Sequence, residues 1–407
     1  MPKISERGLN VQESAIRKLV PLADAAKERG IKVYHLNIGQ PDIKAPVAAL
    51  ESLKKINPET IIEYSNSAGN LSYRKKLAKS YQDINIDVTQ NDIIVTTGGS
   101  EALTIAFMTT LNPGDEIIVP EPFYTNYNSF AFQVGVKIVP ISSSINNDFA
   151  LPPVEDFEKV ITPRTKGIII CNPNNPTGYL YSKEELFKLK TIVEKYDLYV
   201  YSDEVYREFC YDGNEHFSAM KLGLENNVIL IDSVSKRYSM CGARIGCMVT
   251  KNKDVIKNAM KFAQARLCPP YFGQIAAEAT LDITDEERAK YFKAVYDEYI
   301  ARRNCMVSGL NNIPGVYCPN PKGAFYTVVK LPIDDADKFA AWLLTDFNYN
   351  KQTVMVAPAT GFYSDEGKAK GLGKNEVRIA YVLNVDDLKN AIECLSVAIK
   401  EYQKKFM

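Results

Sequence analysis

The middle of the chain alternates short apolar runs with amphipathic stretches of helical period, a pattern typical of α/β layering with mostly parallel strands. The apolar runs are rich in Ile and Val and show little alternation, as expected of strands buried on both faces. Helices are predicted between them, including 100–111 after Gly98-Gly99 and 183–195 after Ser182 as an N-cap. The predicted strands are 93–96, 116–119, 137–140, 167–171, 198–201, 228–231 and 244–250.

The pattern changes near residue 285. A long amphipathic helix is predicted over 286–310, followed by strands 325–330, 353–357 and 376–382, a helix at 336–347 and a final helix from Val385. The first 45 residues hold a short helix and the apolar run 34–38, too little for an independent domain. We therefore expect a large α/β domain over 46–285, a mostly parallel sheet between helices. A smaller α+β domain over 286–407 would pack with an N-terminal arm, 1–45.

Composition narrows the function classes. The 407 residues, 45.6 kDa, suit two or three domains, and Lys+Arg and Asp+Glu are both 49, so the formal net charge is zero. Such a chain lacks the basic face that nucleic-acid or anionic-membrane binding requires. No apolar run approaches the roughly 20 residues of a membrane-spanning helix, and charges stand where a signal peptide would have its apolar core. We expect a soluble, cytoplasmic protein without nucleic-acid or membrane partners.

The residues available for chemistry are also restricted. Only His35 and His216 are present, too few for His-rich zinc sites and unfavourable for most Ser-His-Asp or Cys-His schemes. The eight cysteines form no C-x-x-C pair and are expected to be small buried side chains in a reducing compartment. No metal site is expected, so catalysis should depend on Lys, Asp, Tyr and Arg.

The most informative stretch follows the predicted strand 228–231 and contains Ser233, Ser235, Lys236 and Arg244. A lysine at a buried strand end can lose its proton and attack a carbonyl to give a Schiff base. Two hydroxyls and an arginine beside it offer a phosphate-binding group. The alternative is a solvated loop lysine, the usual environment of this residue type.

This stretch resembles the lysine signature of class I and II aminotransferases, the pyridoxal-phosphate enzymes of fold type I. Further elements occur in the order of that family, so the resemblance covers residues from about 30 to 385. It implies that pyridoxal 5′-phosphate is the cofactor, held by Lys236, and that Ser233, Ser235 and Arg244 bind its phosphate. The family's shared sites also imply a homodimer.

Two segments of the first half match cofactor-binding elements of the family. In 95–103 a strand runs through glycines into a helix, where free N–H groups and the helix dipole face an anion, although an ordinary tight turn has the same appearance. The resemblance assigns the phosphate to Gly99, Ser100 and Glu101. It also places Tyr124 against the face of the pyridine ring, with Phe123 as the alternative if the register shifts by one.

Two strand ends supply the next matches. Pro and Gly stop one strand sharply and leave Asn175 at its carboxyl end, where ligands bind in open α/β sheets, although the segment also reads as a simple turn. The resemblance implies that Asn175 contacts the cofactor's 3′-oxygen and the substrate carboxylate. It assigns Asp203 to the pyridine nitrogen and Tyr206 to the 3′-oxygen. Helix capping by Asp203, or confusion with Glu204, are the alternatives.

The remaining matches concern the substrate and the subunit interface. Arg378 lies within a strand-like run, an unusual place for a cation without a partner. The resemblance makes it the two-pronged ligand of the α-carboxylate. Gly39 matches the family's glycine loop close to the substrate, and Tyr64 matches the tyrosine that reaches the neighbour's phosphate.

The favoured activity is transfer of an amino group from an L-amino acid to 2-oxoglutarate by a ping-pong mechanism, as in aspartate aminotransferases. A fold type I C–S β-lyase or a decarboxylase is the alternative, and a non-enzymatic regulator module is disfavoured because there is no separate DNA-binding head. Where one aspartate-specific subgroup has Lys in the phosphate turn, this chain has Ser100. A dicarboxylic substrate would then need another cation, and Arg266 is the candidate, with a dipole-stabilised helix-end arginine as the alternative.

Overall fold

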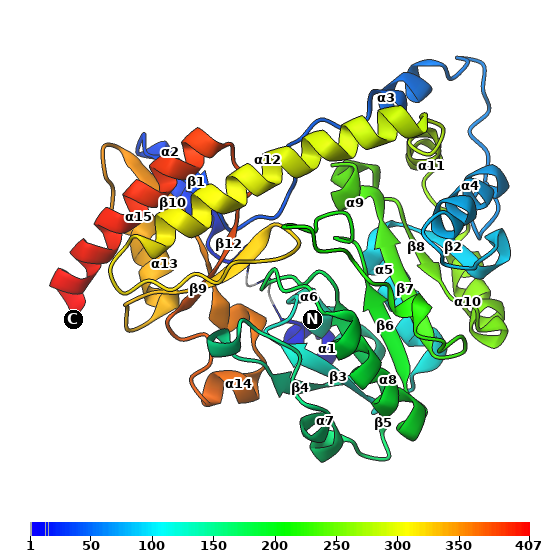
Figure 1. The fold of residues 1–407 in the computed structure, drawn as a ribbon, viewed down its shortest axis with the longest axis horizontal. Coiled ribbons are helices and arrows are strands. Elements are labelled where there is room, and N and C mark those ends of the chain that lie inside the picture. Colours follow the sequence, from blue (N-terminus) through cyan, green and yellow to red (C-terminus); the bar gives the residue numbers. More distant parts are fainter. Residues whose placement is uncertain (1, 13, 15) are drawn as a thin grey trace.

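The computed structural model describes residues 2–12, 14 and 16–407; positions 1, 13 and 15 of the predicted arm lie outside it. A seven-stranded sheet with the order β2-β8-β7-β6-β5-β3-β4 forms its largest layer (Figure 1). β8 is antiparallel to both neighbours and the other pairs are parallel, so the mostly parallel sheet is confirmed. Its strands are β2 (Ile93–Thr96), β3 (Glu116–Glu121), β4 (Lys137–Ser142), β5 (Thr165–Cys171), β6 (Tyr199–Asp203), β7 (Val228–Ser233) and β8 (Gly246–Val249).

Helices cover both faces of this sheet. On one face, side chains of α5 (Gly98–Thr110), α6 (Asn126–Val134) and α10 (Lys253–Arg266) pack on the apolar strand residues. On the other face lie α4 (Leu71–Gln82), α7 (Val154–Val160), α8 (Lys183–Tyr196) and α11 (Tyr271–Ala279), with α3 (Val47–Lys54) against α11. Both faces of the central strands are therefore buried, which explains their continuous Ile and Val runs.

The carboxyl ends of the central parallel strands lie side by side. In the register, Cys171 at the end of β5 faces Asp203 at the end of β6, and Asp203 faces Ile231 of β7. β7 leads directly into the short helix α9 (Val234–Arg237). Residues from these strand ends therefore meet at one edge of the sheet.

One predicted boundary is wrong in a way that affects this edge. Arg244 was expected to begin a strand, but it follows the 3₁₀ turn Cys241–Ala243 in a left-handed conformation, φ 54°, and β8 begins only at Gly246. Gly246 is in close contact with the turn after β2: a Cβ there would lie 2.5 Å from the Gly98 carbonyl carbon. The close approach of these two backbones sets the start of β8. The periodicity of the sequence carries no information about this approach.

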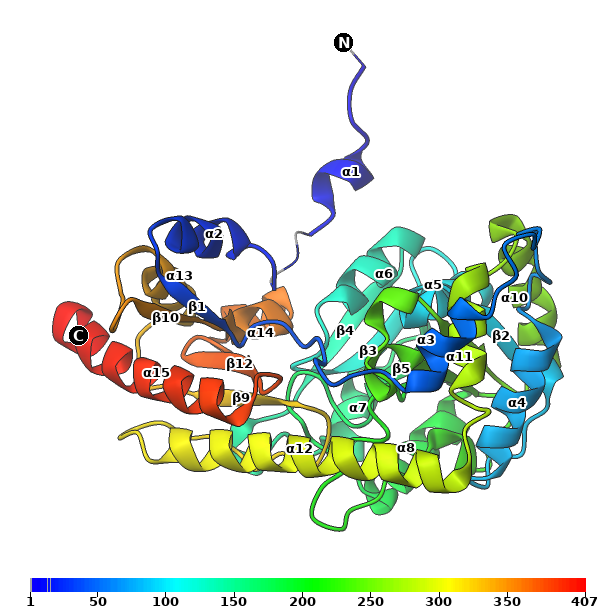
Figure 2. The same cartoon turned by 90° about the horizontal axis from the view of Figure 1, so that it is seen from above.

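The second half of the chain forms another group of elements. β9 (Tyr326–Lys330), β11 (Ala357–Pro358) and β12 (Glu376–Ala380) make an antiparallel sheet in the order β11-β12-β9. Helices α2 (Val20–Glu28), α13 (Ala336–Thr345) and α15 (Val385–Phe406) contribute to its core, with α14 (Asp365–Ala369) at the periphery. The long helix α12 (Asp285–Asn311) runs beside both groups (Figure 2).

The N-terminal residues join this second group. β1 (Lys32–His35) pairs in parallel with β10 (Gln352–Met355), while α1 (Glu6–Asn10) projects from the body and has no buried residue (Figure 2). The domain boundaries at 45 and 285 stay predictions. Within the described residues, no helix is long and apolar enough to cross a membrane.

Candidate active site

The turn between β2 and α5 forms the first part of the site. Gly98 has φ +73°, which an L side chain rarely adopts, and a Cβ there would lie 2.5 Å from Nη2 of Arg244. The Arg244 guanidinium therefore lies directly against the turn, where its Nη1 also donates to the Cys241 carbonyl at 3.0 Å. The N-terminus of α5, with Gly99 and Ser100, is in this way placed beside a cation, which is a suitable arrangement for an anion.

The serines predicted to accompany this anion site are at the start of α9. The Ser233 hydroxyl caps the helix by accepting from the Ser235 amide at 3.0 Å, and it donates to the Ser235 hydroxyl at 2.7 Å. It also contacts the Ile245 carbonyl at 2.9 Å, which ties it to the segment that carries Arg244. The structure thus brings Ser233, Ser235 and Arg244 together, as the sequence predicts.

Lys236 extends from α9 toward the glycine loop. Its Nζ donates to the Gly39 carbonyl at 2.9 Å and lies 4.0 Å from the Cys241 sulfur. Burial lowers the pKa of the Lys236 amine below its ordinary value, since desolvation disfavours the charged form. A larger share of neutral amine makes this lysine a better nucleophile and base.

Asp203 is buried at the end of β6, and no cation of the described residues forms an ion pair with it. Tyr127 donates its hydroxyl to Asp203 Oδ2 at 2.7 Å, and the Val205 amide approaches Oδ1 at 3.4 Å. Burial raises the pKa of the Asp203 carboxyl to about 6. A buried carboxylate of this kind is stabilised when a positively charged group binds next to it.

A chain of polar contacts links the remaining predicted residues. Asn175 Nδ2 donates to the Tyr206 hydroxyl at 3.2 Å, and that hydroxyl lies 3.0 Å from the hydroxyl of Tyr326. Tyr326 in turn donates to the Gly39 carbonyl at 3.3 Å. Gly39 has to be glycine here, because a Cβ would lie 1.8 Å from the Tyr326 hydroxyl oxygen.

Arg378 is the most deeply buried cation of the site. Its Nη1 donates to Asn175 Oδ1 at 3.3 Å, and its Nη2 donates to the Asn37 carbonyl. Its guanidinium stacks between the rings of Tyr326 and Phe362, at 4.8 and 4.7 Å from their centroids. Among the described residues it has no carboxylate partner, and its Nε has no hydrogen bond. A buried arginine held this way is prepared for a bound carboxylate.

Tyr124 and Phe123 have different environments. Phe123 is fully buried in the core beneath α6, whereas Tyr124 is half-buried and its hydroxyl accepts from Asn126 Nδ2 at 2.9 Å. The Tyr124 ring meets the ring of Tyr127 edge-on, 5.5 Å between centroids. Of these two residues, Tyr124 is therefore the one that offers a partly open aromatic face near Asp203.

Three predicted residues lie at the margin of this cluster. The Glu101 carboxylate turns back to accept from the Thr97 amide, and Arg266 Nη1 lies 3.4 Å from it. Arg266 Nη2 also donates to the Ser67 carbonyl at 3.0 Å, so this arginine supports the base of the turn. Tyr64 is 77% exposed.

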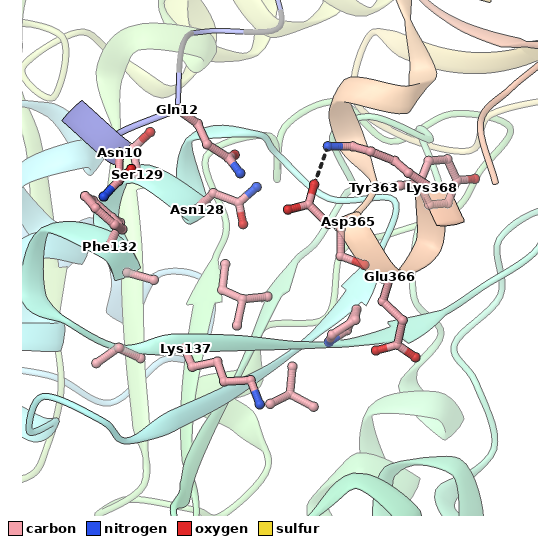
Figure 3. A pocket seen from close by; sticks show the side chains of 16 residues that line it. Asn10, Gln12, Asn128, Ser129, Phe132, Lys137, Tyr363, Asp365, Glu366 and Lys368 are labelled. Atoms are coloured by element: carbon pink, nitrogen blue, oxygen red, sulfur yellow. Dashed lines mark hydrogen bonds and ion pairs between the residues drawn. The ribbon is translucent and has the colours of Figure 1, made fainter. Parts of the chain in front are cut away.

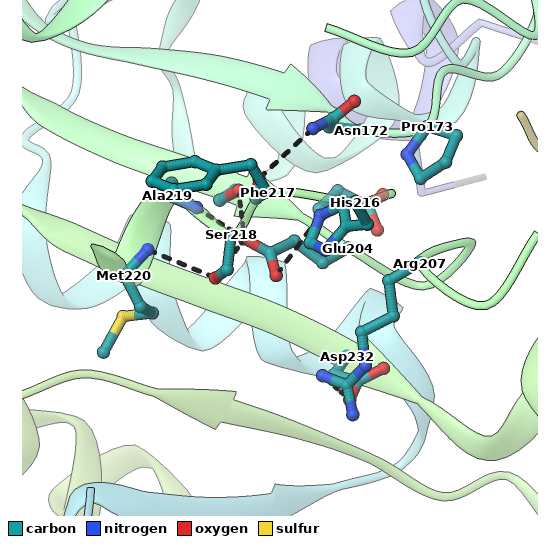
Figure 4. Close-up of polar contacts among 12 residues, drawn as sticks. Asn172, Pro173, Glu204, Arg207, His216, Phe217, Ser218, Ala219, Met220 and Asp232 are labelled. Carbon is teal, nitrogen blue, oxygen red and sulfur yellow. Dashed lines mark hydrogen bonds and ion pairs between the residues drawn. The ribbon is translucent and has the colours of Figure 1, made fainter. Parts of the chain in front are cut away.

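A second buried carboxyl, that of Glu204, directly follows Asp203 in the chain and lies beside His216 and Ser218 (Figure 4). Glu204 Oε1 accepts from the hydroxyls of Ser202 and Ser218, both at 2.9 Å, and from the Ala219 amide at 3.0 Å. Burial raises the pKa of Glu204 to about 7 and lowers the pKa of His216, whose Nε2 lies 3.6 Å from Oε2, to about 3. The imidazole is therefore neutral, and this contact is not an ion pair. Glu204 therefore links the end of β6, through Ser202, to the segment of Ser218 and Ala219.

Sequence reasoning missed two tyrosines of the site. Tyr127 follows Tyr124 by one helical turn, a spacing that could have indicated a shared face. Tyr326 lies in β9, and nothing in its local sequence distinguishes it from a core aromatic residue. Also, no group of His, Cys, Asp and Glu suited to a metal ion occurs in 2–12, 14 and 16–407, and the eight cysteines are free.

The donor set fits pyridoxal phosphate. The N-terminus of α5, where Arg244 leaves no room for a Cβ at Gly98, is suited to bind an anion. It lies beside Lys236, whose pKa is lowered. Among the residues that the structure describes, the buried Asp203 carboxyl has no cation partner, as binding of a protonated pyridine nitrogen requires, and the Arg378 guanidinium has no carboxylate partner. Fold and site together define a pyridoxal-phosphate enzyme of fold type I.

Comparison with known proteins gives the family. Residues 31–395 match the model of the family "Aminotransferase class I and II". The chain is 33% identical to an aspartate aminotransferase of Pyrococcus horikoshii, covering 98% of this chain and 97% of that one. It is 30% identical to aromatic-amino-acid aminotransferase 2 of Thermococcus litoralis, with 98% of both covered. The chain therefore belongs to the class I and II aminotransferase family, and the predicted cofactor, fold and enzyme class are confirmed.

Solved structures agree with this assignment. The Thermus thermophilus aspartate aminotransferase with maleate superposes with a TM-score of 0.88 at 28% identity, covering 98% of this chain and all of that one. An alanine aminotransferase from Pyrococcus furiosus gives the same TM-score at 32% identity and the same coverage. The substrates named for these similar proteins differ, so the family alone does not determine the amino-acid donor.

Proposed function

We propose that the protein transfers the amino group of aspartate, or of a similar dicarboxylic L-amino acid, to 2-oxoglutarate in two alternating half-reactions. The observation that carries the proposal is the buried guanidinium of Arg378, held by Asn175 and Asn37 and lacking a carboxylate partner among the described residues. Amino acids and oxo acids both carry an α-carboxylate that would complete this pair. Support for aspartate comes from the names of several relatives, including those from Pyrococcus horikoshii and Bacillus subtilis.

We assign the cofactor contacts as follows. Gly99, Ser100, Ser233, Ser235 and Arg244 hold the phosphate, and Glu101 fixes the turn that presents it. Tyr124 covers one face of the ring, Asp203 pairs with the ring nitrogen, and Asn175 and Tyr206 donate to the 3′-oxygen. The support is the set of contacts among them: the Asn175 amide donates to the Tyr206 hydroxyl at 3.2 Å, and the Ser233 hydroxyl donates to the Ser235 hydroxyl at 2.7 Å.

When bound, pyridoxal phosphate supplies an electron sink that makes the Cα proton of an amino acid removable. Lys236 would hold the cofactor covalently at rest and, once released, would act first as the base that removes the substrate's Cα proton and then as the acid that gives a proton back. Its lowered pKa suits that exchange. Asp203, oriented by Tyr127, keeps the ring nitrogen protonated. Arg378 fixes the α-carboxylate, so that the Cα–H bond faces Lys236.

The substrate role of Arg266 stays a prediction. Its contacts with Glu101 and the Ser67 carbonyl favour the alternative that it stabilises the phosphate turn. Measuring the activity of Arg266→Ala with aspartate and with alanine separates the two roles. If Arg266 binds the side-chain carboxylate, the variant loses activity with aspartate alone.

We also propose a homodimer. Large apolar side chains are exposed on α3 and on the segment that leads to α4, including Val47, Leu50, Ile61 and Ile62, and Ile61 is 81% exposed. An apolar patch of this kind is typical of a subunit interface. Tyr64 lies in the same segment, so that covering this face with a second copy would bring Tyr64 toward the partner's phosphate. The cytoplasmic location and the absence of nucleic-acid and membrane partners stay predictions from the sequence.

The experiment is a screen of amino donors with 2-oxoglutarate, following formation of glutamate and of each 2-oxo acid. Aspartate or a similar dicarboxylic donor should give stoichiometric glutamate and oxo acid. Release of pyruvate with ammonia, or of carbon dioxide, without glutamate would indicate a lyase or decarboxylase instead. Light scattering should give a dimer, and Ile61→Glu should lower both the dimer fraction and the activity.

A further inference from the structure

Two carbonyl groups of the glycine loop, here residues 37–45, contact the two cations of the site. Arg378 Nη2 donates to the Asn37 carbonyl, and Lys236 Nζ donates to the Gly39 carbonyl at 2.9 Å. The Tyr326 hydroxyl donates to the same Gly39 carbonyl at 3.3 Å. One short segment therefore sets where the lysine amine lies relative to the guanidinium.

The backbone of the glycine loop does not hold this shape by itself. In the part of the chain that the structure describes, no backbone-to-backbone hydrogen bond involves residues 37–45. Leu36, just before the loop, is the last residue with such bonds, to Met355 and Ala380. A segment without backbone hydrogen bonds changes its dihedral angles easily unless side chains hold it. Side-chain contacts therefore determine where the loop carbonyls point.

Arg302 of α12 anchors the glycine loop through Asp42. Its Nη1 donates to Asp42 Oδ1 at 2.7 Å and its Nη2 donates to Oδ2 at 3.3 Å, so that the contact is bidentate. Its Nε donates to Glu298 at 2.8 Å, one helical turn earlier. Arg302 Nη1 also donates to the carbonyl of Val382, two positions after the end of β12. This arginine therefore connects the loop to the strand that carries Arg378.

The Arg302–Asp42 pair differs from an ordinary surface ion pair. Lys368 and Asp365, which are joined by a dashed line in Figure 3, lie three positions apart, and the Asp365 side chain is 83% exposed. Such a pair contributes little, because water and salt screen it. Arg302, in contrast, is buried, and its partner Asp42 lies 260 positions away in the chain. Its contact fixes an arrangement of distant segments.

Arg303, the next residue of α12, forms a similar pair with a different segment. Its Nη1 and Nη2 donate to the Asp212 carboxylate at 2.6 and 2.8 Å, and its side chain is also buried. The Asp212 side chain is 43% exposed, close to the 49% of Asp42. The two pairs share a helix, a geometry and a degree of burial, and they differ in the segment that the aspartate belongs to. Asp212 is therefore a matched control for Asp42.

We propose that Asp42 and Arg302 are positioning residues, whose ion pair holds the glycine loop in the shape that orients both cations of the site. They act through the loop carbonyls and not on the substrate itself. This inference rests on the proposed function, because it takes Lys236 as the acid–base group and Arg378 as the carboxylate ligand. A displacement of about 1 Å in such groups can cost about 100-fold in rate, so an ion pair outside the site can control turnover.

The test compares Asp42→Asn and Asp42→Glu with Asp212→Asn. Asn at position 42 keeps the size of the side chain and removes its charge, while Arg302 keeps its contacts with Glu298 and the Val382 carbonyl. The variant should therefore still fold, and urea unfolding should give similar losses of stability for Asp42→Asn and Asp212→Asn. Each holoenzyme is assayed for kcat and KM with the amino donor and 2-oxoglutarate.

A second measurement does not depend on turnover. In the full-length apoenzyme, labelling of Lys236 by trinitrobenzenesulfonate is followed as a function of pH and located by peptide mapping. The reagent reacts with the neutral amine, and a carbonyl that accepts from an amine favours its charged form. Displacing the Gly39 carbonyl in Asp42→Asn should therefore shift the labelling of Lys236 to lower pH.

Asp42→Asn should also lower kcat/KM about 10- to 100-fold, with a higher KM from the displaced Arg378 and a lower kcat from the displaced Lys236. Asp212→Asn should match the wild type in kinetics and in labelling. Asp42→Glu should recover part of the loss, because it restores the charge opposite Arg302.

Three results would overturn the inference while amino transfer stands: unchanged kinetics in Asp42→Asn, equal kinetic losses in Asp42→Asn and Asp212→Asn, or unchanged labelling of Lys236. Equal losses would mean that both pairs only stabilise the packing of α12. If the wild type transfers no amino group from any donor, the proposed function fails. The labelling of Lys236 in Asp42→Asn would then still decide whether the ion pair positions the lysine.

Discussion

Arg378 and Asn175, 203 positions apart in the chain, contact each other in the interior of the protein, with the guanidinium donating to the amide oxygen at 3.3 Å. The amide nitrogen of the same Asn175 donates to Tyr206 at 3.2 Å, so both ends of this side chain are fixed. Asn175 follows β5 of the large sheet, and Arg378 lies in β12 of the small one. The carboxylate site that we propose therefore forms only when the two sheets are packed together.

The covalent role of Lys236 has a direct chemical test. The purified holoenzyme should be yellow, and borohydride reduction followed by peptide mapping should place a pyridoxyl group on Lys236. Lys236→Ala should abolish transamination, because no other described amine of lowered pKa lies in the site. Lys251→Ala is the control, since Lys251 pairs with Glu225 at 2.5 Å on the surface. A label on Lys251 or Lys253 would contradict the assignment.

Asp203 and its hydrogen-bond donor should differ in the size of their effects. Asp203→Asn keeps the shape but removes the ion pair with the ring nitrogen, so kcat should fall by several orders of magnitude while the phosphate contacts still retain the cofactor. Tyr127→Phe removes only the 2.7 Å hydrogen bond and should reduce kcat about 10- to 100-fold. Steady-state kinetics with saturating cofactor measure both. If Asp203→Asn kept a kcat close to that of the wild type, another residue would have to keep the ring nitrogen protonated.

The narrow turn between β2 and α5, where we propose that the phosphate binds, should not tolerate an added methyl group. Gly98→Ala combines a positive φ of 73° with a Cβ 2.5 Å from the Arg244 guanidinium, so it should displace that cation and weaken pyridoxal-phosphate affinity at least tenfold. Gly30→Ala is the matched control: its φ is 77°, but nothing lies within 4 Å of the added Cβ. Both should lose about 1 kcal/mol of stability from backbone strain. Equilibrium titration of each apoenzyme with pyridoxal phosphate measures the cofactor affinity. Equal affinities for the two variants would argue against phosphate binding at this turn.

Glu204 should make stability depend on pH. Its folded-state pKa of about 7 lies above its ordinary 4.5, so the folded protein holds this proton more strongly than the unfolded chain does. This contribution is complete below about pH 4.5 and is lost as pH rises through 7. His216 has the opposite sign, because its pKa is lowered from 6.5 to about 3 and its contribution is lost as pH falls.

Glu204→Gln isolates the carboxyl. Relative to the wild type, this variant should gain free energy of unfolding as pH rises from about 5 to 8, by up to about 3 kcal/mol. Urea unfolding at fixed protein concentration measures the difference at each pH. If the difference in free energy of unfolding stayed constant across this pH range, Glu204 would be ionised throughout it.

The layered architecture and the lysine-based chemistry could both be read from local patterns in the sequence. The runs that became β2, β5 and β7 are continuous in Ile and Val because burial on both faces of a sheet imposes that pattern locally. The lysine stretch from Ser233 to Gly246 is contiguous, so its resemblance to the family could be read without a fold. Asn175 and Asp203 could also be identified from the sequence, because each stands at the carboxyl end of a predicted strand, where ligands bind in open α/β sheets.

Which side chains meet across different elements depends on how the chain packs. Tyr127 reaches Asp203, Tyr326 reaches Gly39, and Arg266 turns to Glu101, because strand register and helix docking bring together residues that no local period relates. The left-handed conformation of Arg244 follows from the close approach of the Gly98 and Gly246 backbones. Periodicity reports which face of an element is buried, whereas the partner that covers this face depends on long-range packing, and the polar contacts of the site are set by that packing.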